Sequence, residues 1–165
     1  MTVRFRVATR ADVPAIIGLL DDDDISRSRQ AVSGPGVSRP VVSGPVSEAA
    51  DARRWQAFEA IDADPRNELI VADDDGVVVG TCQLTFTPSL SRAGAERMTI
   101  EAVRVATDRR GAGIGHAMMR WAIAQARARG CGMVQLTTDK RRVDAHRFYA
   151  SLGFAASHEG MKIYL

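Results

Sequence analysis

The feature that most constrains this chain is a glycine-rich turn between a strand-like run and a long helical pattern. The run RMTIEAVRVA ends at Ala106 and is followed, from Arg109, by RRGAGIGHAMMRWAIAQARARG, which carries glycines at positions 111, 113 and 115. A strand, a tight turn and a helix in direct succession leave the N–H groups of the first helical turn free at the end of a sheet, where they bind anions well. Because glycines carry no side chains, we predict that main-chain groups of this turn cradle a bulky diphosphate.

The spacing of the glycines differs from the two common phosphate-binding motifs. A dinucleotide fingerprint requires GxGxxG, and His116 stands where its third glycine would fall. A mononucleotide loop requires GxxxxGK[ST], and no lysine lies near the turn. Arg109 and Arg110 add positive charge beside it. A structural alternative stays open, in which the glycines only form a tight turn into a buried helix.

Period-two and helical patterns alternate along the chain and predict an α/β fold in one domain over residues 1–165. We expect strands at 3–8, 68–73, 77–86, 97–106 and 133–138 and a last hairpin over 154–165. We expect four helices, at 11–20, from 47 to before Pro65, from the glycine turn to Arg129, and at 143–153. Thr9, with Asp12 three residues later, is the expected N-terminal cap of the first helix. Residues 21–46, with an acidic run and many Ser, Gly and Pro, predict a long loop, either a plain surface insertion or a binding loop. The order of these strands and helices implies an α/β sandwich with a mixed sheet.

Composition and charge limit the classes of function that the chain can have. The net charge of +2 gives no strong signal for nucleic acid, although arginines cluster between Arg104 and Arg147, and no stretch approaches the ~20 apolar residues of a membrane span. The N-terminus lacks an apolar signal core, so a cytoplasmic location is expected. Cys82 and Cys131 are too few for a disulfide framework or a zinc site, and no metal is predicted.

Two motifs carry a resemblance to a known family. RGAGIG, from Arg110 to Gly115, matches the R/Q-x-x-G-x-G/A signature of the GNAT acyltransferase superfamily, and DAHRFYASLGF, from Asp144 to Phe154, resembles the helix that follows the fifth strand in that family. The resemblance implies the GNAT fold, with a mixed central sheet of about six to seven strands flanked by about four helices, and acetyl-CoA as co-substrate. Arg142 departs from the family pattern, because an asparagine is common at that place. It could instead reach a CoA phosphate, or be a solvated arginine.

The resemblance also implies contacts with the CoA molecule. The main chains of Val103 and Val105 would pair with the pantetheine amides like an added strand. The remaining residues expected around CoA are Arg104, Arg109, Arg110, Gly111, Ala112, Gly113, Ile114, Gly115, His116, Arg142 and Phe148.

Two side chains are candidates for the chemistry of acyl transfer. Tyr149 resembles the family's general acid, and a phenol with a pKa of about 10 keeps the proton that a departing thiolate needs. Glu101 could accept a proton from the incoming ammonium, directly or through water. Strict strand alternation would place Glu101 on one face with Val103 and Val105; if that face is turned away from the cleft, Glu101 is a surface charge.

The histidine side chains are weaker candidates for catalysis. The sequence also says less about the acceptor of the acetyl group. His146 is expected at a helix surface, and His158 could line an acceptor pocket. The C-terminal section is similar to that of a bacterial subgroup that includes kasugamycin-type aminoglycoside N-acetyltransferases. We therefore expect a small-molecule primary amine, an aminosugar or a polyamine, with the loop 21–46 on the substrate side. Two alternative functions stay open: protein or peptide N-acetylation, and a non-catalytic acyl-CoA sensor. A homodimer through the C-terminal strands also stays open.

Overall fold

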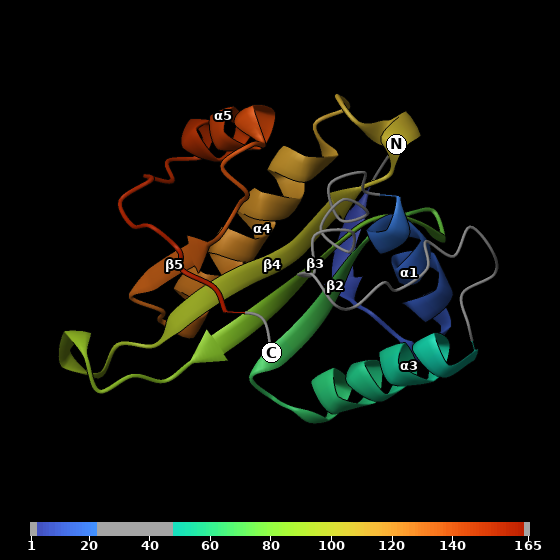
Figure 1. Ribbon diagram of the computed structural model, residues 1–165, viewed down its shortest axis with the longest axis horizontal. Helices are drawn as coiled ribbons and strands as arrows, with labels where there is room; N and C mark the ends of the chain where they lie inside the picture. Colours follow the sequence, from blue (N-terminus) through green and yellow to red (C-terminus); the bar gives the residue numbers. More distant parts are fainter. Residues whose placement is uncertain (1–2, 23–47, 164–165) are drawn as a thin grey trace.

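The computed structural model describes residues 3–22 and 48–163, and this part of the chain forms one five-stranded sheet (Figure 1). The strands lie in chain order and comprise β1 (Arg4–Val7), β2 (Asn67–Asp74), β3 (Val77–Thr87), β4 (Arg97–Val105) and β5 (Met133–Leu136). Strands β1 to β4 pair antiparallel, whereas β4 and β5 are parallel. The mixed α/β architecture expected from the sequence is therefore confirmed.

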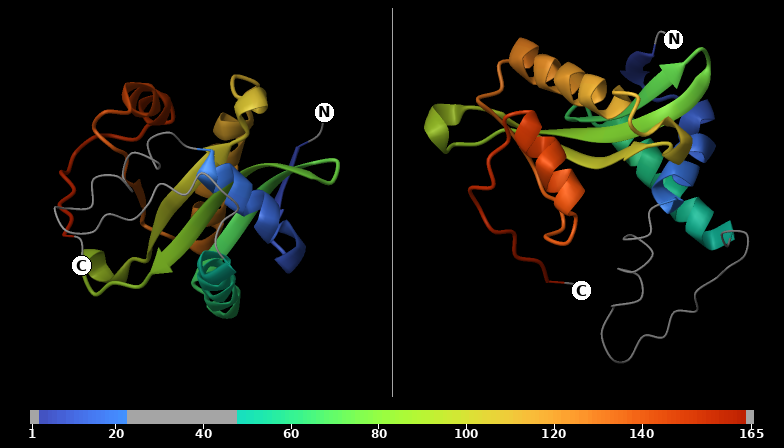
Figure 2. Two further views of the ribbon diagram at one scale, coloured as in Figure 1. Left: turned by 45° about the vertical axis from the view of Figure 1, so that its right-hand side comes forward. Right: turned by 90° about the horizontal axis from the view of Figure 1, so that it is seen from above.

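The helices cover the two faces of the sheet (Figures 1 and 2). They comprise α1 (Val13–Asp21), α3 (Glu48–Ala63), α4 (Ile114–Arg129) and α5 (Val143–Ser151), with short 3-10 turns at Arg10–Asp12, Arg92–Gly94 and Thr107–Arg109. Helix α4 begins directly after Gly113 and ends at Arg129, and the following Gly130 has a left-handed φ of 82°, as predicted for a C-terminal cap. None of the helices in the described ranges is long and apolar enough to cross a membrane.

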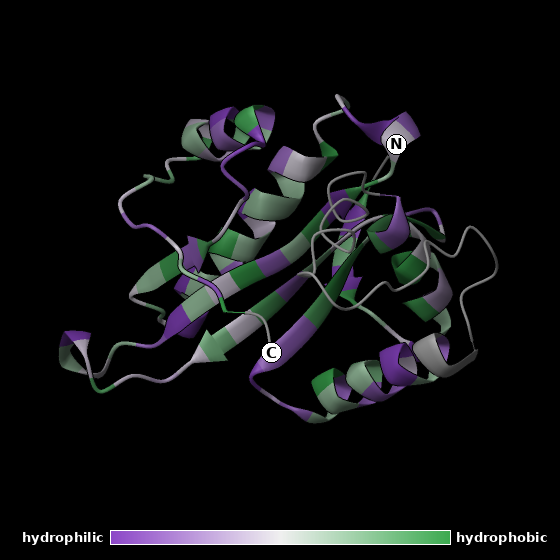
Figure 3. Cartoon of the chain, in the orientation of Figure 1, coloured by the Kyte–Doolittle hydropathy of each residue, from purple (hydrophilic) through white to green (hydrophobic). Residues whose placement is uncertain are grey.

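Each face of the sheet has its own hydrophobic core, and hydrophilic and hydrophobic positions alternate along the strands between them (Figure 3). The larger core joins β2, β3 and β4 to α4, and its fully buried members include Leu84, Met98, Ile100 and Met118. Aromatic residues of α5 pack against the same core. The smaller core holds α1 and α3 against the other face.

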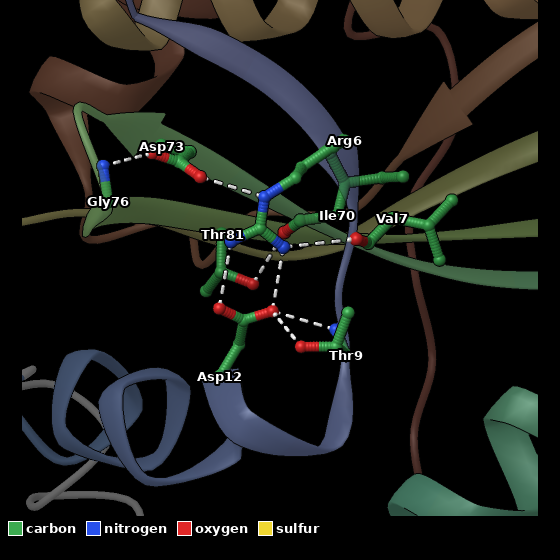
Figure 4. A network of polar contacts seen from close by, with 8 residues as sticks. All are labelled: Arg6, Val7, Thr9, Asp12, Ile70, Asp73, Gly76 and Thr81. Carbon is green, nitrogen blue, oxygen red and sulfur yellow. Dashed lines mark hydrogen bonds and ion pairs between the residues drawn. The ribbon is translucent and has the colours of Figure 1, made fainter.

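A partly buried ion-pair network ties the first strand to the start of α1 (Figure 4). The guanidinium of Arg6 donates to both carboxylate oxygens of Asp12, at 2.7 and 3.0 Å, and to Asp73 at 2.8 Å. Asp12 also accepts from the main-chain N–H of Thr9 at 2.7 Å, as the predicted cap requires. These contacts, with the hydrogen bond from Arg6 as the largest cause, hold the pKa of the Asp12 carboxyl well below its usual range.

Two expectations about the strands are wrong. The sheet has five strands over the described residues rather than six to seven, and residues 155–163 form no hairpin. The apolar side chains of that segment, Met161 and Ile163, are 95% and 85% exposed. They therefore bury no surface that would offset the entropy lost on ordering a strand. Most of the predicted loop 21–46 lies outside the described residues.

Candidate active site

The parallel pair β4–β5 separates before β4 ends. Paired positions run from Arg97 with Met133 to Ile100 with Leu136, where β5 stops, whereas β4 continues to Val105. The end of β4 therefore has no strand partner on its β5 side within the described chain. Such an edge presents main-chain N–H and C=O groups in a row and can accept an extended ligand as an added strand.

A β-bulge interrupts β4 at the point of separation. Gln83 pairs with Glu101 but Thr81 pairs with Arg104, so β4 has one extra residue there, and Ala102 adopts a left-handed φ of 52°. Val103 and Val105 thereby turn toward the core under α4, whereas Glu101 stays exposed on the opposite face. The predicted alternation, with Glu101 on one face with both valines, is wrong because a bulge shifts the side-chain period by one.

Two contacts show toward which edge the main-chain N–H and C=O groups at the end of β4 point. The N–H of Ala106 donates to Val79 of β3 at 2.9 Å, and the carbonyl oxygen of Arg104 faces Gly80 of the same strand. Since main-chain groups of alternate residues point to opposite edges, those of Val103 and Val105 point to the open side. Their carbonyl oxygens accept hydrogen bonds from side chains, Val103 from Arg104 Nη1 at 2.8 Å and Val105 from Arg110 Nε at 3.2 Å.

The glycine turn lies at the end of this open edge and leads into α4. Gly111 and Gly113 both have a φ of 81°, and a Cβ added at either position would meet no atom within 4 Å. The first intrahelical bond runs from the N–H of Ala117 to Gly113 at 3.0 Å, so the preceding N–H groups of the first turn lack helical partners. The turn thus combines free donors, the positive end of a helix dipole and open space.

The third glycine has a different role, because it allows close packing. A Cβ on Gly115 would lie 3.4 Å from Phe148 of α5 and 3.7 Å from Val105. Phe148 stacks edge-on with His116, at 4.6 Å between ring centroids, and with Tyr149 at 5.0 Å. This packing places the end of β4, the glycine turn and the aromatic residues of α5 next to one another.

Tyr149 is partly buried against the larger core. Burial raises the pKa of its hydroxyl above the usual value, and the positive charges of Arg142 and Arg104 partly oppose this shift. The phenol therefore keeps its proton at neutral pH, and two guanidinium groups are close enough to stabilise negative charge near it.

The remaining predicted site residues have other contacts. The guanidinium of Arg109 lies 3.0 Å from buried Asp74, so its charge is turned toward β2. The ring of His116 contacts Ser151 at 3.1 Å. His146 contacts the carbonyl oxygen of Asp139 at 3.1 Å, and His158 is exposed beside Ser157. Ala112 lies in the turn, Ile114 at the start of α4 and Arg142 at the N-cap of α5, and their contacts with CoA stay predictions.

Sequence reasoning missed the bulge at Ala102 and the Arg109–Asp74 ion pair. An alanine in a strand carries no signal for a left-handed conformation, and Asp74 is 35 residues away from Arg109. No group of three or more His, Cys, Asp or Glu suited to a metal ion occurs among the described residues. The thiol of buried Cys82 has its pKa raised to about 12 by burial, so it is not a reactive thiolate.

The described chain thus combines a strand edge without a strand partner, an open glycine turn and a partly buried phenol. Residues 39–154 match the family model of the acetyltransferase (GNAT) family. The chain therefore belongs to the GNAT acetyltransferase family, whose members use acetyl-CoA.

The chain is also similar to individual proteins, two of which are acetyltransferases. The chain is 31% identical over 161 residues to streptothricin acetyltransferase of Streptomyces lavendulae, covering 93% of this chain and 82% of the relative. It is 29% identical to glucosamine 6-phosphate N-acetyltransferase of Trypanosoma brucei brucei, covering 88% and 92%. A crystal structure from Bacillus halodurans C-125, described as a transcriptional regulator, superposes with a TM-score of 0.86 at 41% identity and covers 99% of this chain and all of that one.

Proposed function

We propose that the protein transfers the acetyl group of acetyl-CoA directly to a primary amine of a small molecule. The observation that carries the proposal is the joining of three features by Gly115 and Phe148: the open edge of β4, the glycine turn and Tyr149. The relatives named above act on streptothricin and on glucosamine 6-phosphate, which supports a small-molecule acceptor.

The residues present fit acetyl-CoA. The free N–H groups at the start of α4 would hold its diphosphate, and the open space at Gly111 and Gly113 leaves room for it. The main chains of Val103 and Val105 would pair with the pantetheine amides, once the side chains of Arg104 and Arg110 release the carbonyl oxygens that accept from them. Arg110 would then be available to the phosphates.

Acetyl-CoA supplies an acetyl group activated as a thioester. In the reaction the amine nitrogen bonds to the acetyl carbon and the carbon–sulfur bond breaks. The hydroxyl of Tyr149 would donate the proton that the leaving sulfur needs, since burial keeps the phenol protonated. The exposed carboxylate of Glu101, on the face opposite α4, would take a proton from the incoming ammonium, directly or through water.

Incubation with acetyl-CoA and a panel of amines tests the proposal, with free thiol and the mass of the acceptor as readouts. We expect amine-dependent thiol release and an acceptor heavier by one acetyl group. Stabilisation by acetyl-CoA without amine-dependent thiol release would instead favour a non-catalytic acyl-CoA-binding module. Acetylation of peptides alone would favour protein N-acetylation.

A further inference from the structure

The sheet face that bears Glu101 changes character from one side to the other. Near β2 it is apolar, and Leu69 and Val71 pack there in the core under α1 and α3. Toward β5 the same face is polar. The polar bed, as we call it, consists of Gln83, Thr85, Thr99, Glu101 and Gln135.

These residues are neighbours on one face because they are paired across the sheet. Gln83 lies opposite Glu101 and Thr85 opposite Thr99 in the β3–β4 ladder, and Thr99 lies beside Gln135 in the β4–β5 ladder. Leu69 of the apolar part pairs with Gln83, which fixes the face that they share. The side chains of the polar bed are half-buried, except that of Glu101, which is exposed.

Hydrogen bonds orient the amide side chains of the polar bed. Gln83 donates through Nε2 to Asn67 at 3.2 Å, and Gln135 donates through Nε2 to Thr99 Oγ1 at 3.1 Å. Among the described residues, the Oε1 atoms of both glutamines receive no hydrogen bond, and the hydroxyl proton of Thr99 has no acceptor. The polar bed therefore presents two fixed acceptors and a donor beside one carboxylate.

The polar bed also adjoins the proposed site of reaction. Glu101 is the last residue before the bulge, and the main chain of Val103, directly after the bulge, borders the open edge. Because Val103 and Val105 turn their side chains toward α4, an acceptor approaching from the other face meets Glu101 and the polar bed first.

We propose that the polar bed binds the acceptor, and that the acceptor is a hydroxyl-rich primary amine of the aminosugar class. The inference rests on the proposed function and makes its substrate more specific. Sugar hydroxyls donate to Gln83 Oε1 and Gln135 Oε1 and accept from Thr99, while the ammonium lies at Glu101.

Two other classes of amine fit the polar bed less well. A polyamine carries several charges, and the bed offers one carboxylate and no second one to pair with them. A phosphate accepts hydrogen bonds without donating strongly, so it would face the glutamine oxygens and the carboxylate of Glu101 unfavourably. Arg97 lies on the same face but beyond Thr99, at the end away from the bulge.

A set of four amines and three variants tests the inference. The amines are glucosamine, cyclohexylamine (a ring of the same size without hydroxyls), spermidine and glucosamine 6-phosphate. We expect kcat/KM for glucosamine to exceed that for cyclohexylamine and for spermidine by at least tenfold. Gln83→Leu and Gln135→Leu should each raise KM for glucosamine about fivefold, the value of one neutral hydrogen bond, with KM for cyclohexylamine unchanged.

Gln125→Leu, on α4 across the sheet, is the matched control and should change neither constant. Acetyl-CoA affinity, measured by calorimetry, should be the same in all three variants. Higher kcat/KM for cyclohexylamine, spermidine or glucosamine 6-phosphate than for glucosamine would overturn the inference, as would equal effects of the variants on glucosamine and cyclohexylamine. Acetylation that fails with every amine would instead contradict the proposed function itself.

Discussion

Gly113 and Gly130 lie at opposite ends of α4 in nearly the same backbone conformation, with φ values of 81° and 82°. A Cβ added at either position would meet no atom within 4 Å. Alanine in this left-handed region costs about 1 kcal/mol more than glycine. Gly113→Ala and Gly130→Ala should therefore lower the melting temperature by a similar amount, about 2–4 °C for a chain of this size.

The two variants should differ in their affinity for acetyl-CoA. A methyl group at Gly113 would occupy the space assigned to the diphosphate, whereas Gly130 lies at the far end of the helix. Loss of one hydrogen bond from a main-chain N–H to a charged phosphate oxygen costs about 1.5–3 kcal/mol, which corresponds to a factor of about 10 to 150 in Kd.

Isothermal titration calorimetry with acetyl-CoA measures this difference directly. The Kd of Gly113→Ala should rise at least tenfold above the wild-type value, and that of Gly130→Ala should stay within about twofold of it. Equal affinities of the two variants would refute the reasoning, because strain alone is common to both. A melting temperature that falls in only one variant would show that the two positions are not matched in strain.

Three further predictions concern single side chains. Tyr149→Phe should lower kcat about 100-fold or more with little change in the Kd of acetyl-CoA, because the ring packing stays and only the donated proton is lost. Steady-state kinetics measures kcat and calorimetry measures Kd, and an unchanged kcat would show that the tyrosine takes no part in the mechanism. Glu101→Gln should lower kcat/KM most at pH 6–7 and least near pH 9, where more of the amine is already neutral; a loss that is equal at all pH values would argue against proton transfer to the carboxylate. Asp12→Asn should reduce the free energy of unfolding by about 2 kcal/mol at pH 7, because it removes charged hydrogen bonds from Arg6, which is itself about one-third exposed. Since the pKa of the Asp12 carboxyl is lowered in the folded state, its contribution is fully present above the unfolded-state value of about 4 and is lost progressively as the pH falls from there toward the lower folded-state value. Urea unfolding should show the gap between wild type and variant beginning to narrow below about pH 4 and narrowing further at each lower pH, and a gap that stays constant below pH 4 would contradict the assignment.

Local signals in the sequence predicted much of the fold. Thr9 and Asp12 marked the first helix, Gly113 and Gly130 bounded α4, and alternation marked the five observed strands. These features depend on residues close together in the chain, where capping and periodicity act directly. The last hairpin was predicted from the same kind of pattern, but a strand also needs a neighbour, and the alternation of residues 154–165 says nothing about whether one is present.

The features of the candidate site that sequence reasoning missed are those set by tertiary contacts. The glycine turn and Tyr149 could be located because their motifs are short and contiguous. The bulge at Ala102 depends on how β4 pairs with β3, and the polar bed depends on the register of three strands. Gln83 and Gln135 are 52 residues apart in the chain, so no local pattern could bring them together.

The central claim is that main-chain amides at the start of α4 hold the diphosphate of acetyl-CoA and so place its thioester beside Tyr149. A crystal structure of the complex with acetyl-CoA tests it most directly. The account predicts diphosphate oxygens within about 3 Å of main-chain nitrogens between Gly111 and His116, and the sulfur within hydrogen-bonding reach of the Tyr149 hydroxyl. Acetyl-CoA bound elsewhere, with this turn empty, would contradict it.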